Sequence, residues 1–220
     1  MSHQDFELYA TQRPHIRDVS DVYRRFFSKH LGKLSADARV LDFGCGHGIY
    51  YSFFSEYFNQ ANIYGVEVSV KRVAYCKSIG WENVHYLPIL SPLPFTNEMF
   101  DVVHCDQVIE HIPKKEIGFY IKELHRVLKK DGKMVFITPN YPIKRLYDIY
   151  NAISKRDITR VKDDPTHVAR YDFKRLVNVF QPDFSVILEP TGGRFWNRLP
   201  YNFFSHKIIG LVQKRQEGVE

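Results

Sequence analysis

Apolar residues are spaced differently in successive parts of this chain. Near the N-terminus they recur every three or four positions, which predicts an amphipathic helix. These positions are Ile16, Val19, Val22, Tyr23, Phe26, Phe27, Leu31 and Leu34. Further on, short β-rich runs alternate with helical patterns, as in a parallel sheet covered by helices. The runs predicted to be strands are 39–43, 62–68, 83–87, 100–105 and 133–138.

One of the intervening helices has a predicted end as well as a predicted face. Apolar residues between Ile117 and Leu128 lie on one side of it. Asp131-Gly132 follows in the position where helices commonly stop. We therefore expect this helix to end at Asp131-Gly132 and the next strand to begin at Lys133.

The pattern changes in the last third of the chain. Residues 139–170 are rich in Tyr, Lys, Arg and Asp and have only a weak helical pattern. A polar segment of this length is typical of a substrate lid. A helix resumes at 172–180, and the strands at 185–191 and 206–214 follow without a helix between them, which predicts an antiparallel hairpin. The expected fold is α/β, with a seven-stranded, mostly parallel sheet and helices on both faces.

Composition indicates a single globular domain. Hydrophobic residues make up 44% of the chain and charged residues 25%, as in ordinary folded proteins. No apolar run approaches the roughly 20 residues that span a bilayer, and the polar N-terminus lacks the apolar core of a secretory signal. Three cysteines without a CxxC pair argue against disulfides and a thiolate zinc site. We expect a cytoplasmic protein with reduced thiols.

The net charge of +6 is unevenly distributed. Residues 1–138 contain 17 Lys and Arg against 16 Asp and Glu, whereas residues 139–220 contain 14 against 9. An uneven distribution of charge gives information about binding partners rather than about the fold. It favours an anionic substrate or a nucleic acid, and the alternative is that the charge only keeps the protein soluble.

The first predicted strand ends in the glycine-rich loop Asp42-Phe43-Gly44-Cys45-Gly46-His47-Gly48. Glycines in such a loop let backbone N–H groups approach a ligand closely. Glu67 ends the second strand, 23 positions after Gly44, where a carboxylate can accept hydrogen bonds from both hydroxyls of a ribose. Together these features predict an adenosine-containing ligand. The leading Asp42 suits a ligand that carries an ammonium rather than a pyrophosphate.

This loop resembles the first motif of class I S-adenosylmethionine-dependent methyltransferases of the type 11-like family. Three more segments stand at the family's spacing: Leu93-Pro94-Phe95 with Phe100-Asp101-Val102-Val103, Val108-Ile109-Glu110-His111-Ile112, and Leu128-Lys129-Lys130-Asp131-Gly132. The resemblance covers residues 35–140 and implies a Rossmann-like fold. It also implies S-adenosylmethionine as the methyl donor and S-adenosylhomocysteine as the product.

The resemblance assigns roles within the cofactor site. Asp42 and the loop glycines would hold the methionine end, Glu67 the ribose, and the backbone near Cys105 the sulfonium. Relatives often bind the adenine amine with an Asp where this chain has Ile89 or Leu90, so adenine recognition here rests on backbone groups and apolar packing. The expected cofactor-binding residues are Asp42, Gly44, Cys45, Gly46, Gly48, Glu67, Val68, Ile89, Leu90, Cys105, Asp106 and Gln107.

The resemblance also divides the single domain of residues 1–220 into regions. Residues 1–37 would form an N-terminal helical cap and residues 38–138 the cofactor-binding core. Residues 139–170 would form the substrate lid, and residues 171–220 the C-terminal helix and β-hairpin.

Two histidines are the candidates for acid–base chemistry. Methyl transfer from an activated sulfonium depends mainly on positioning, but a hydroxyl acceptor also needs a base, for which His is suited near neutral pH. His111 follows the fourth strand, and His167 precedes the resumed helix. The expected catalytic residues are His111, His167 and Glu110.

Four residues are candidates for metal ligands. Gln107, Glu110, His111 and His167 resemble the Glu-x-x-Glu-His…His metal set of small-RNA 3′-end 2′-O-methyltransferases. Gln107 supplies a neutral amide where that set has a carboxylate, and this weakens an oxygen-rich Mg²⁺ site. We therefore expect no bound metal.

Residues after the fifth strand are the candidates for binding the acceptor. The expected substrate-binding residues are Tyr141, Arg145, Arg170, Tyr171, Arg194 and Trp196. Our first hypothesis is O-methylation of a polar small molecule, such as a metabolite, a sugar or a glycan precursor, which is anionic if the basic part of the chain binds it. The alternatives are an RNA 2′-O-methyltransferase and a cofactor-binding partner subunit without turnover. The acceptor atom, the pathway and the oligomeric state stay open.

Overall fold

The computed structural model describes residues 7, 18–141, 143–161, 163–164, 166–181, 183–191 and 205–215. Arg194 and Trp196, two of the expected substrate-binding residues, lie outside the described residues.

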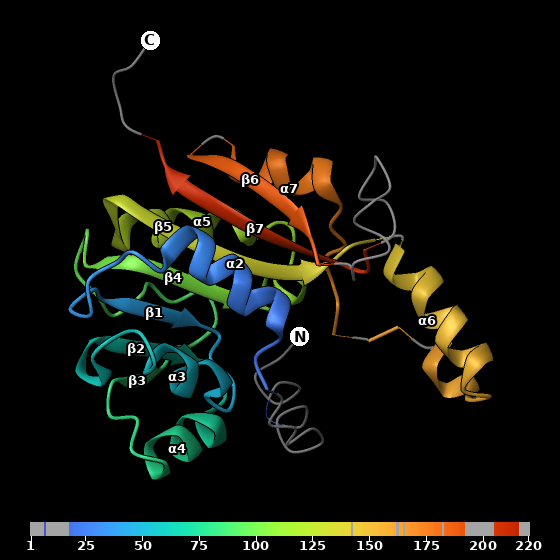
Figure 1. Cartoon of the computed structure of the whole chain (residues 1–220), viewed down its shortest axis with the longest axis horizontal. Helices are drawn as coiled ribbons and strands as arrows, with labels where there is room; N and C mark the ends of the chain where they lie inside the picture. Colours follow the sequence, from blue (N-terminus) through green and yellow to red (C-terminus); the bar gives the residue numbers. More distant parts are fainter. Residues whose placement is uncertain are drawn as a thin grey trace.

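Seven strands form one sheet in the order β3-β2-β1-β4-β5-β7-β6 (Figure 1). The strands are β1 Val40–Phe43, β2 Ile63–Glu67, β3 Val84–Tyr86, β4 Phe100–Asp106, β5 Leu128–Pro139, β6 Phe184–Pro190 and β7 Lys207–Lys214. The first five pair in parallel, and β7 runs antiparallel to both β5 and β6. The predicted sheet with its C-terminal hairpin is confirmed.

Helices cover both faces of this sheet (Figure 1). The α-helices are α2 Asp21–Leu31, α3 Ile49–Phe54, α4 Val70–Ser78, α5 Ile117–Val127, α6 Ile143–Ser154 and α7 Phe173–Phe180. Three short 3₁₀ turns are η1 Gln60–Asn62, η2 Ile109–His111 and η3 Ile158–Val161. Residues of α2, α3 and α4 pack in one apolar cluster and residues of α5 and α7 in another. None of the helices in the described ranges is long and apolar enough to cross a membrane.

Helix α2 shows how the N-terminal pattern becomes packing. Ser20 caps the helix, because its side chain accepts a hydrogen bond from the backbone N–H of Tyr23. The buried face of α2 contains Tyr23, Phe26, Phe27 and Leu31. The Phe27 ring meets Phe53 of α3 edge to face, with the centroids 5.1 Å apart. The helix is shorter than the apolar pattern that predicted it, which spans residues 16–34.

The expected end of α5 at Asp131-Gly132 is wrong. The helix ends at Val127, and β5 already begins at Leu128. Leu128 is fully buried and pairs with Phe100, and the register then shifts by a bulge. Gly132 lies within this irregular strand segment, where a Cβ would come within 2.7 Å of Leu128 Cγ. This glycine therefore serves close packing in a strand rather than the end of a helix.

The strand order places the candidate site. The sheet reverses its order between β1 and β4, and ligands of open α/β sheets bind beyond the carboxyl ends of strands at such a point. Helix α6 and η3 also lie beyond the carboxyl ends of the parallel strands (Figure 1).

Candidate functional site

A cavity of about 1560 Å³ opens at the carboxyl ends of β1, β2 and β4. Its walls come from the loops that follow these strands, from α2 and from one face of α6. Ligand pockets usually measure about 300–1000 Å³. The cavity therefore has room for a cofactor and a second molecule together.

The glycine loop forms the floor of the cavity next to β1. Gly44, Gly46 and Gly48 adopt φ values of 76°, 58° and 74°, which residues other than Gly rarely adopt. A Cβ on Gly44 would meet Val108 Cγ2 at 2.4 Å, whereas one on Gly46 would meet nothing within 4 Å. Gly44 thus lets the loop pack against the segment after β4, and Gly46 leaves space for a ligand.

Glu67 joins the loop to the end of β2. Only 4% of Glu67 is exposed, and its side chain lines the cavity. Its Oε2 accepts a hydrogen bond from Gly46 N at 2.9 Å, and its Oε1 accepts one from Ser69 N at 3.0 Å. Burial raises the pKa of Glu67, and Arg72, whose Nη1 is 3.8 Å from Oε1, opposes that shift. Each carboxylate oxygen keeps a lone pair with which it could accept a ribose hydroxyl.

Asp42 is held by a partner that the sequence did not reveal. Its Oδ1 lies 2.7 Å from His104 Nδ1, and both residues are buried. The His104 ring packs 4.0 Å from the Tyr50 ring, centroid to centroid. Asp42 lines the cavity, so the buried histidine fixes the orientation of a carboxylate that faces the ligand space.

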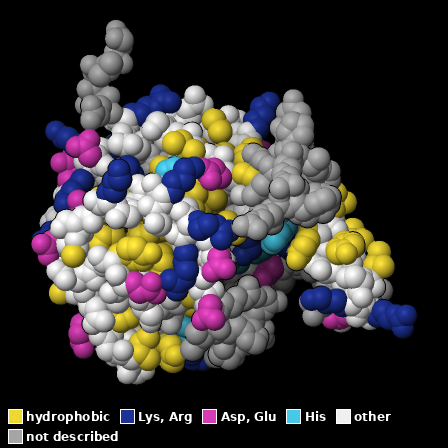
Figure 2. All heavy atoms as spheres, viewed as in Figure 1, with side chains coloured by type: hydrophobic (Ala, Val, Ile, Leu, Met, Phe, Trp, Pro, Cys, Tyr) yellow, Lys and Arg dark blue, Asp and Glu magenta, His cyan; other side chains and the backbone are white. Residues whose placement is uncertain are grey.

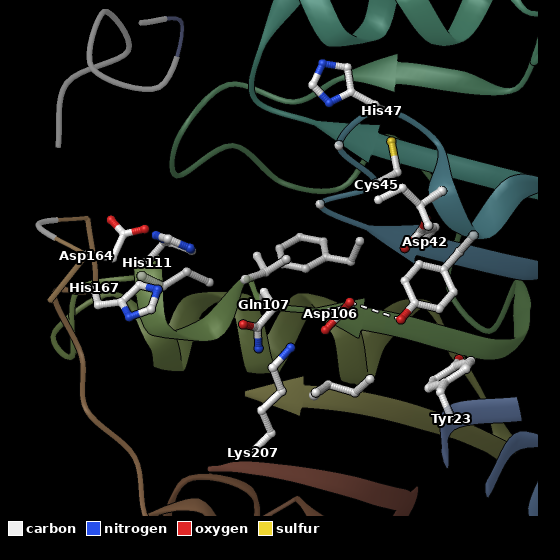
Figure 3. A pocket seen from close by; sticks show the side chains of 18 of the residues that line it. Tyr23, Asp42, Cys45, His47, Asp106, Gln107, His111, Asp164, His167 and Lys207 are labelled. Atoms are coloured by element: carbon white, nitrogen blue, oxygen red, sulfur yellow. Dashed lines mark hydrogen bonds between the residues drawn. The ribbon is translucent and has the colours of Figure 1, made fainter. Parts of the chain in front are cut away.

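A second carboxylate, Asp106, faces the same end of the cavity (Figure 3). Tyr50 Oη donates a hydrogen bond to its Oδ2 at 3.0 Å, and its Oδ1 is buried without a hydrogen-bond partner in the described part of the chain. Tyr50 was not among the residues expected at the site. Two carboxylates at one end of the cavity suit the ammonium of a methionine moiety.

Gln107 follows with a left-handed backbone, φ 56°. Its N–H donates to Ile137 O at 2.9 Å, which ties the turn to β5. Its side-chain Nε2 is buried, with no partner among the residues that the structure describes. Non-glycine residues in this conformation are concentrated at functional sites.

His111 and His167 lie side by side at the other end of the cavity (Figure 3). Their ring centroids are 4.9 Å apart. Burial lowers the pKa of His111 to about 4, and it also lowers the pKa of His167. Both rings are therefore neutral near pH 7.

Each imidazole is engaged through its Nδ1. His111 Nδ1 lies 3.1 Å from Thr166 O, and His167 Nδ1 lies 2.8 Å from Tyr141 Oη. Because a carbonyl oxygen can only accept, His111 carries its proton on Nδ1 and has a lone pair on Nε2.

Glu110 is fully buried and does not line the cavity. Thr138 Oγ1 donates to its Oε2 at 3.1 Å, and burial raises the pKa of Glu110 to about 8. The ligand atoms of Glu110, His111 and His167 all lie within 4.8 Å of one another. Two neutral imidazoles and Glu110, once it has lost its proton to a bound cation, would form a donor set that suits Zn²⁺, Mn²⁺ or Fe²⁺ better than Mg²⁺.

Most of the expected cofactor-binding residues meet at this cavity. Those that line it are Asp42, Gly44, Cys45, Gly46, Glu67, Val68, Ile89, Asp106 and Gln107. The exceptions are Gly48, which precedes α3, Cys105, which is buried in β4, and Leu90, whose N–H donates to Tyr120 Oη.

The four expected substrate-binding residues that the structure describes do not line the cavity. Tyr141 and Tyr171 are buried, at 4% and 3% exposure, behind the cavity wall. Arg145 pairs with Asp148 at 3.4 Å, and Arg170 lies over the Tyr141 ring. Other residues that follow the fifth strand line the cavity instead, and Tyr147 is one of them. The sequence analysis missed Lys144, Asp148, Asn151, Lys155, His206 and Lys207.

Comparisons with known proteins identify the type of domain. Residues 41–136 match the model of a methyltransferase domain. The chain is 31% identical over 139 residues to malonyl-(acyl-carrier protein) O-methyltransferase of Legionella pneumophila, covering 60% of this chain and 48% of that protein. It is 27% identical over 129 residues to ubiquinone biosynthesis O-methyltransferase of Pelagibacter ubique, covering 56% and 51%. The chain thus spans about half the length of these relatives.

Solved structures agree on the fold. The crystal structure of an S-adenosylmethionine-dependent methyltransferase from Aquifex aeolicus has a TM-score of 0.61 at 16% identity, covering 96% of this chain and 97% of that one. Residues 41–136 therefore match a methyltransferase domain, and the likeness to the solved structure concerns the fold. S-adenosylmethionine is the cofactor that such a domain implies.

Proposed function

We propose that this protein transfers the methyl group of S-adenosylmethionine to a hydroxyl of a polar, anionic small molecule, with His167 as the base. The observation that carries the proposal is the placement of two neutral histidines across one cavity from Asp42 and Asp106 (Figure 3). The carboxylates suit the methionine end of the cofactor. The histidines then lie where an acceptor hydroxyl would lose its proton. The names of the two relatives, both O-methyltransferases, support the same acceptor atom.

The hydrogen bonds around His167 favour it over His111 as the base. Nearby cations, Lys144 foremost, help to lower the pKa of Asp163, so this carboxylate is ionised. It therefore accepts a hydrogen bond from Tyr141 Oη, at 2.9 Å. The phenol oxygen can then only accept from His167 Nδ1–H, which leaves the lone pair on Nε2. His111, with a pKa of about 4, is the weaker base of the two. His111 would then position His167 or the acceptor.

The cavity wall supports an anionic acceptor. Lys207 extends into the cavity beside Gln107 (Figure 3), and Lys144 lines the cavity from α6. Lys144 is committed to Asp148 and Asp163, at 2.8 and 2.7 Å. Arg72 lies beside Glu67, and Lys155 is exposed beyond the end of α6. Lys207 is therefore the cation we assign to an acidic group of the acceptor. A sugar phosphate or a carboxylated phenol has the required hydroxyl and charge.

The test is turnover of S-adenosylmethionine against a panel of sugar phosphates and hydroxylated aromatic acids, each paired with its deoxy analogue, and against a short RNA. We expect methylated product, identified by mass, from an anionic hydroxyl compound and none from its deoxy partner. Methylation of RNA alone would reject the small-molecule acceptor. Tight binding of S-adenosylhomocysteine without any product would instead support a partner subunit.

A metal-assisted reaction is the second candidate, because the ligand atoms of Glu110, His111 and His167 lie within 4.8 Å of one another. A metal there would use the same Nε2 lone pairs that a base needs, so the two mechanisms exclude each other. A chelator distinguishes them. Turnover by the base is unchanged after EDTA treatment, whereas the metal-assisted route is lost and returns with Mn²⁺ or Zn²⁺.

A further inference from the structure

Helix α6 exposes an unusual amount of apolar surface. Leu146, Ile149, Tyr150 and Ile153 are 60%, 41%, 67% and 74% exposed. They follow one another at intervals of three, one and three residues, so they form a single stripe about 100° wide along a helix about 18 Å long. Figure 2 shows hydrophobic side chains along the projecting arm that α6 and η3 form beside the body of the molecule. We refer to these four residues as the α6 stripe.

Neither the fold nor the cavity accounts for this stripe. The α6 residues that line the cavity are Lys144, Tyr147, Asp148, Asn151 and Lys155. At 100° per residue they occupy the opposite side of the helix from the stripe. The small turn η3 packs against α6 without covering the stripe, because all four residues remain exposed. A contiguous apolar face of this kind on a soluble surface marks an interaction site.

Charge around the stripe indicates the partner. Residues 143–161 contain five Lys and Arg against two Asp, a net charge of +3. Arg145 lies next to Ile149 around the helix, and the exposed Arg156 follows the end of α6 at Ser154. An apolar stripe bordered by arginines is the pattern of a helix that lies in the surface of an anionic membrane. The long arginine stems can cover apolar surface while their charged groups reach phosphates.

The shape of the arm agrees with a flat partner. In Figure 1, α6 and η3 extend away from the sheet, beyond the carboxyl ends of its parallel strands. The stripe is therefore exposed on a part of the molecule that stands away from the sheet. Tyr150 adds an amphipathic ring of the kind enriched at membrane interfaces.

We propose that the α6 stripe docks this protein on the surface of an anionic lipid bilayer. The helix lies in the interface and does not span it. Because the other face of α6 lines the cavity, docking would place the cavity wall next to the lipid headgroups. The proposal concerns attachment only and does not depend on which acceptor is methylated.

The experiment is flotation of the full chain with phosphatidylcholine vesicles, with and without about 30% phosphatidylglycerol. We expect binding to the anionic vesicles that weakens as salt is raised. The double variant Ile149→Ser/Ile153→Ser should lower the partition coefficient at least about 10-fold. Its control is Ile187→Ser, which changes an isoleucine of β6 that is 50% exposed and should bind like the original chain.

Binding of S-adenosylhomocysteine by each variant shows that it is folded, independently of its attachment to lipid. The membrane proposal is overturned if neither vesicle binds, or if the double variant binds like Ile187→Ser. It is also overturned if light scattering shows a dimer that the double variant converts to a monomer while vesicles stay unbound. In that case the α6 stripe is an interface with a second copy.

Discussion

At the scale of single residues, we expect cofactor affinity to depend on Glu67. Its carboxylate accepts hydrogen bonds from Gly46 N and Ser69 N and faces the cavity. Glu67→Gln turns one acceptor oxygen into an NH₂ group that opposes a backbone N–H. We expect the affinity for S-adenosylhomocysteine, measured by calorimetry, to fall about 10- to 100-fold, as for a lost hydrogen bond to a charged group. Glu82→Gln, at an exposed position after α4, is the control. Equal affinities in the two variants would remove the ribose role of Glu67.

His167 makes the base hypothesis testable through the pH dependence of turnover. A base works only when it is unprotonated, so the rate should fall as the pH drops through the pKa of His167. Burial lowers that pKa below its usual 6.5, which places the fall on the acidic side of pH 6.5 and the plateau at neutral pH. His167→Ala should reduce kcat about 10²- to 10⁴-fold and leave S-adenosylhomocysteine affinity nearly unchanged. His85→Ala, on β3 away from the cavity, is the control.

Tyr141→Phe tests whether the phenol positions His167. The variant removes the oxygen that accepts from His167 Nδ1–H and that connects the ring to Asp163. Without this acceptor the protonated imidazolium is less stable, so the acidic limb of the pH–rate profile should move to lower pH while kcat decreases. A loss of rate with an unmoved limb would indicate a structural role only.

At the scale of elements, the close pairing of β5 with β7 depends on Gly210. Gly210 pairs with Phe136, and a Cβ at Gly210 would come within 2.2 Å of the Phe136 ring. Gly210→Ala should therefore lower the free energy of unfolding by about 1–3 kcal/mol in a urea titration, as overpacking does. Gly118→Ala is the matched control. It lies on the exposed side of α5 with nothing within 4 Å of the new Cβ, so it should cause no loss and gain up to about 1 kcal/mol. A Gly210→Ala chain as stable as Gly118→Ala would show that the ring can move aside.

The elements also show how far the sequence can predict this molecule. The short β-rich runs of the sequence predicted the bounds of every strand except β5 to within a few residues. Burial in a sheet selects such short runs of apolar residues, which differ from the three- or four-residue spacing of a helix. The end of α5 was misjudged because Asp131-Gly132 is typical of a helix end, whereas the buried Leu128 already pairs with Phe100. The tertiary contact overrode the local signal.

Contacts between distant parts of the chain account for what the sequence missed at the site. Asp42 meets His104 across 62 positions and His167 meets Tyr141 across 26, and neither pair has a local pattern. On α6 the sequence pointed to Arg145, while the cavity is lined by Lys144 and its neighbours at helical spacing. The apolar face of α6 is exposed and its mostly polar face lines the cavity, so only the packing of the arm decides which face points inward.

At the scale of the whole molecule, the distribution of charge separates the two classes of acceptor. The first 138 residues are nearly neutral, and the remaining residues, which supply α6 and Lys207 to the cavity, have an excess of five positive charges. An RNA would contact many of these cations at once and release a counterion for each phosphate bound. A small anion would meet Lys207 and few others. Raising the salt concentration from about 50 to 200 mM should therefore change the KM for a small acceptor only a few-fold, whereas RNA binding would weaken about 10³-fold or more.

Lys207→Gln should raise the KM of the acceptor about 10-fold while the affinity for S-adenosylhomocysteine stays unchanged. Lys71→Gln, at an exposed position of α4, removes the same charge outside the cavity and should leave both values as they are. A steep dependence on salt that persists in Lys207→Gln would favour a polyanionic substrate.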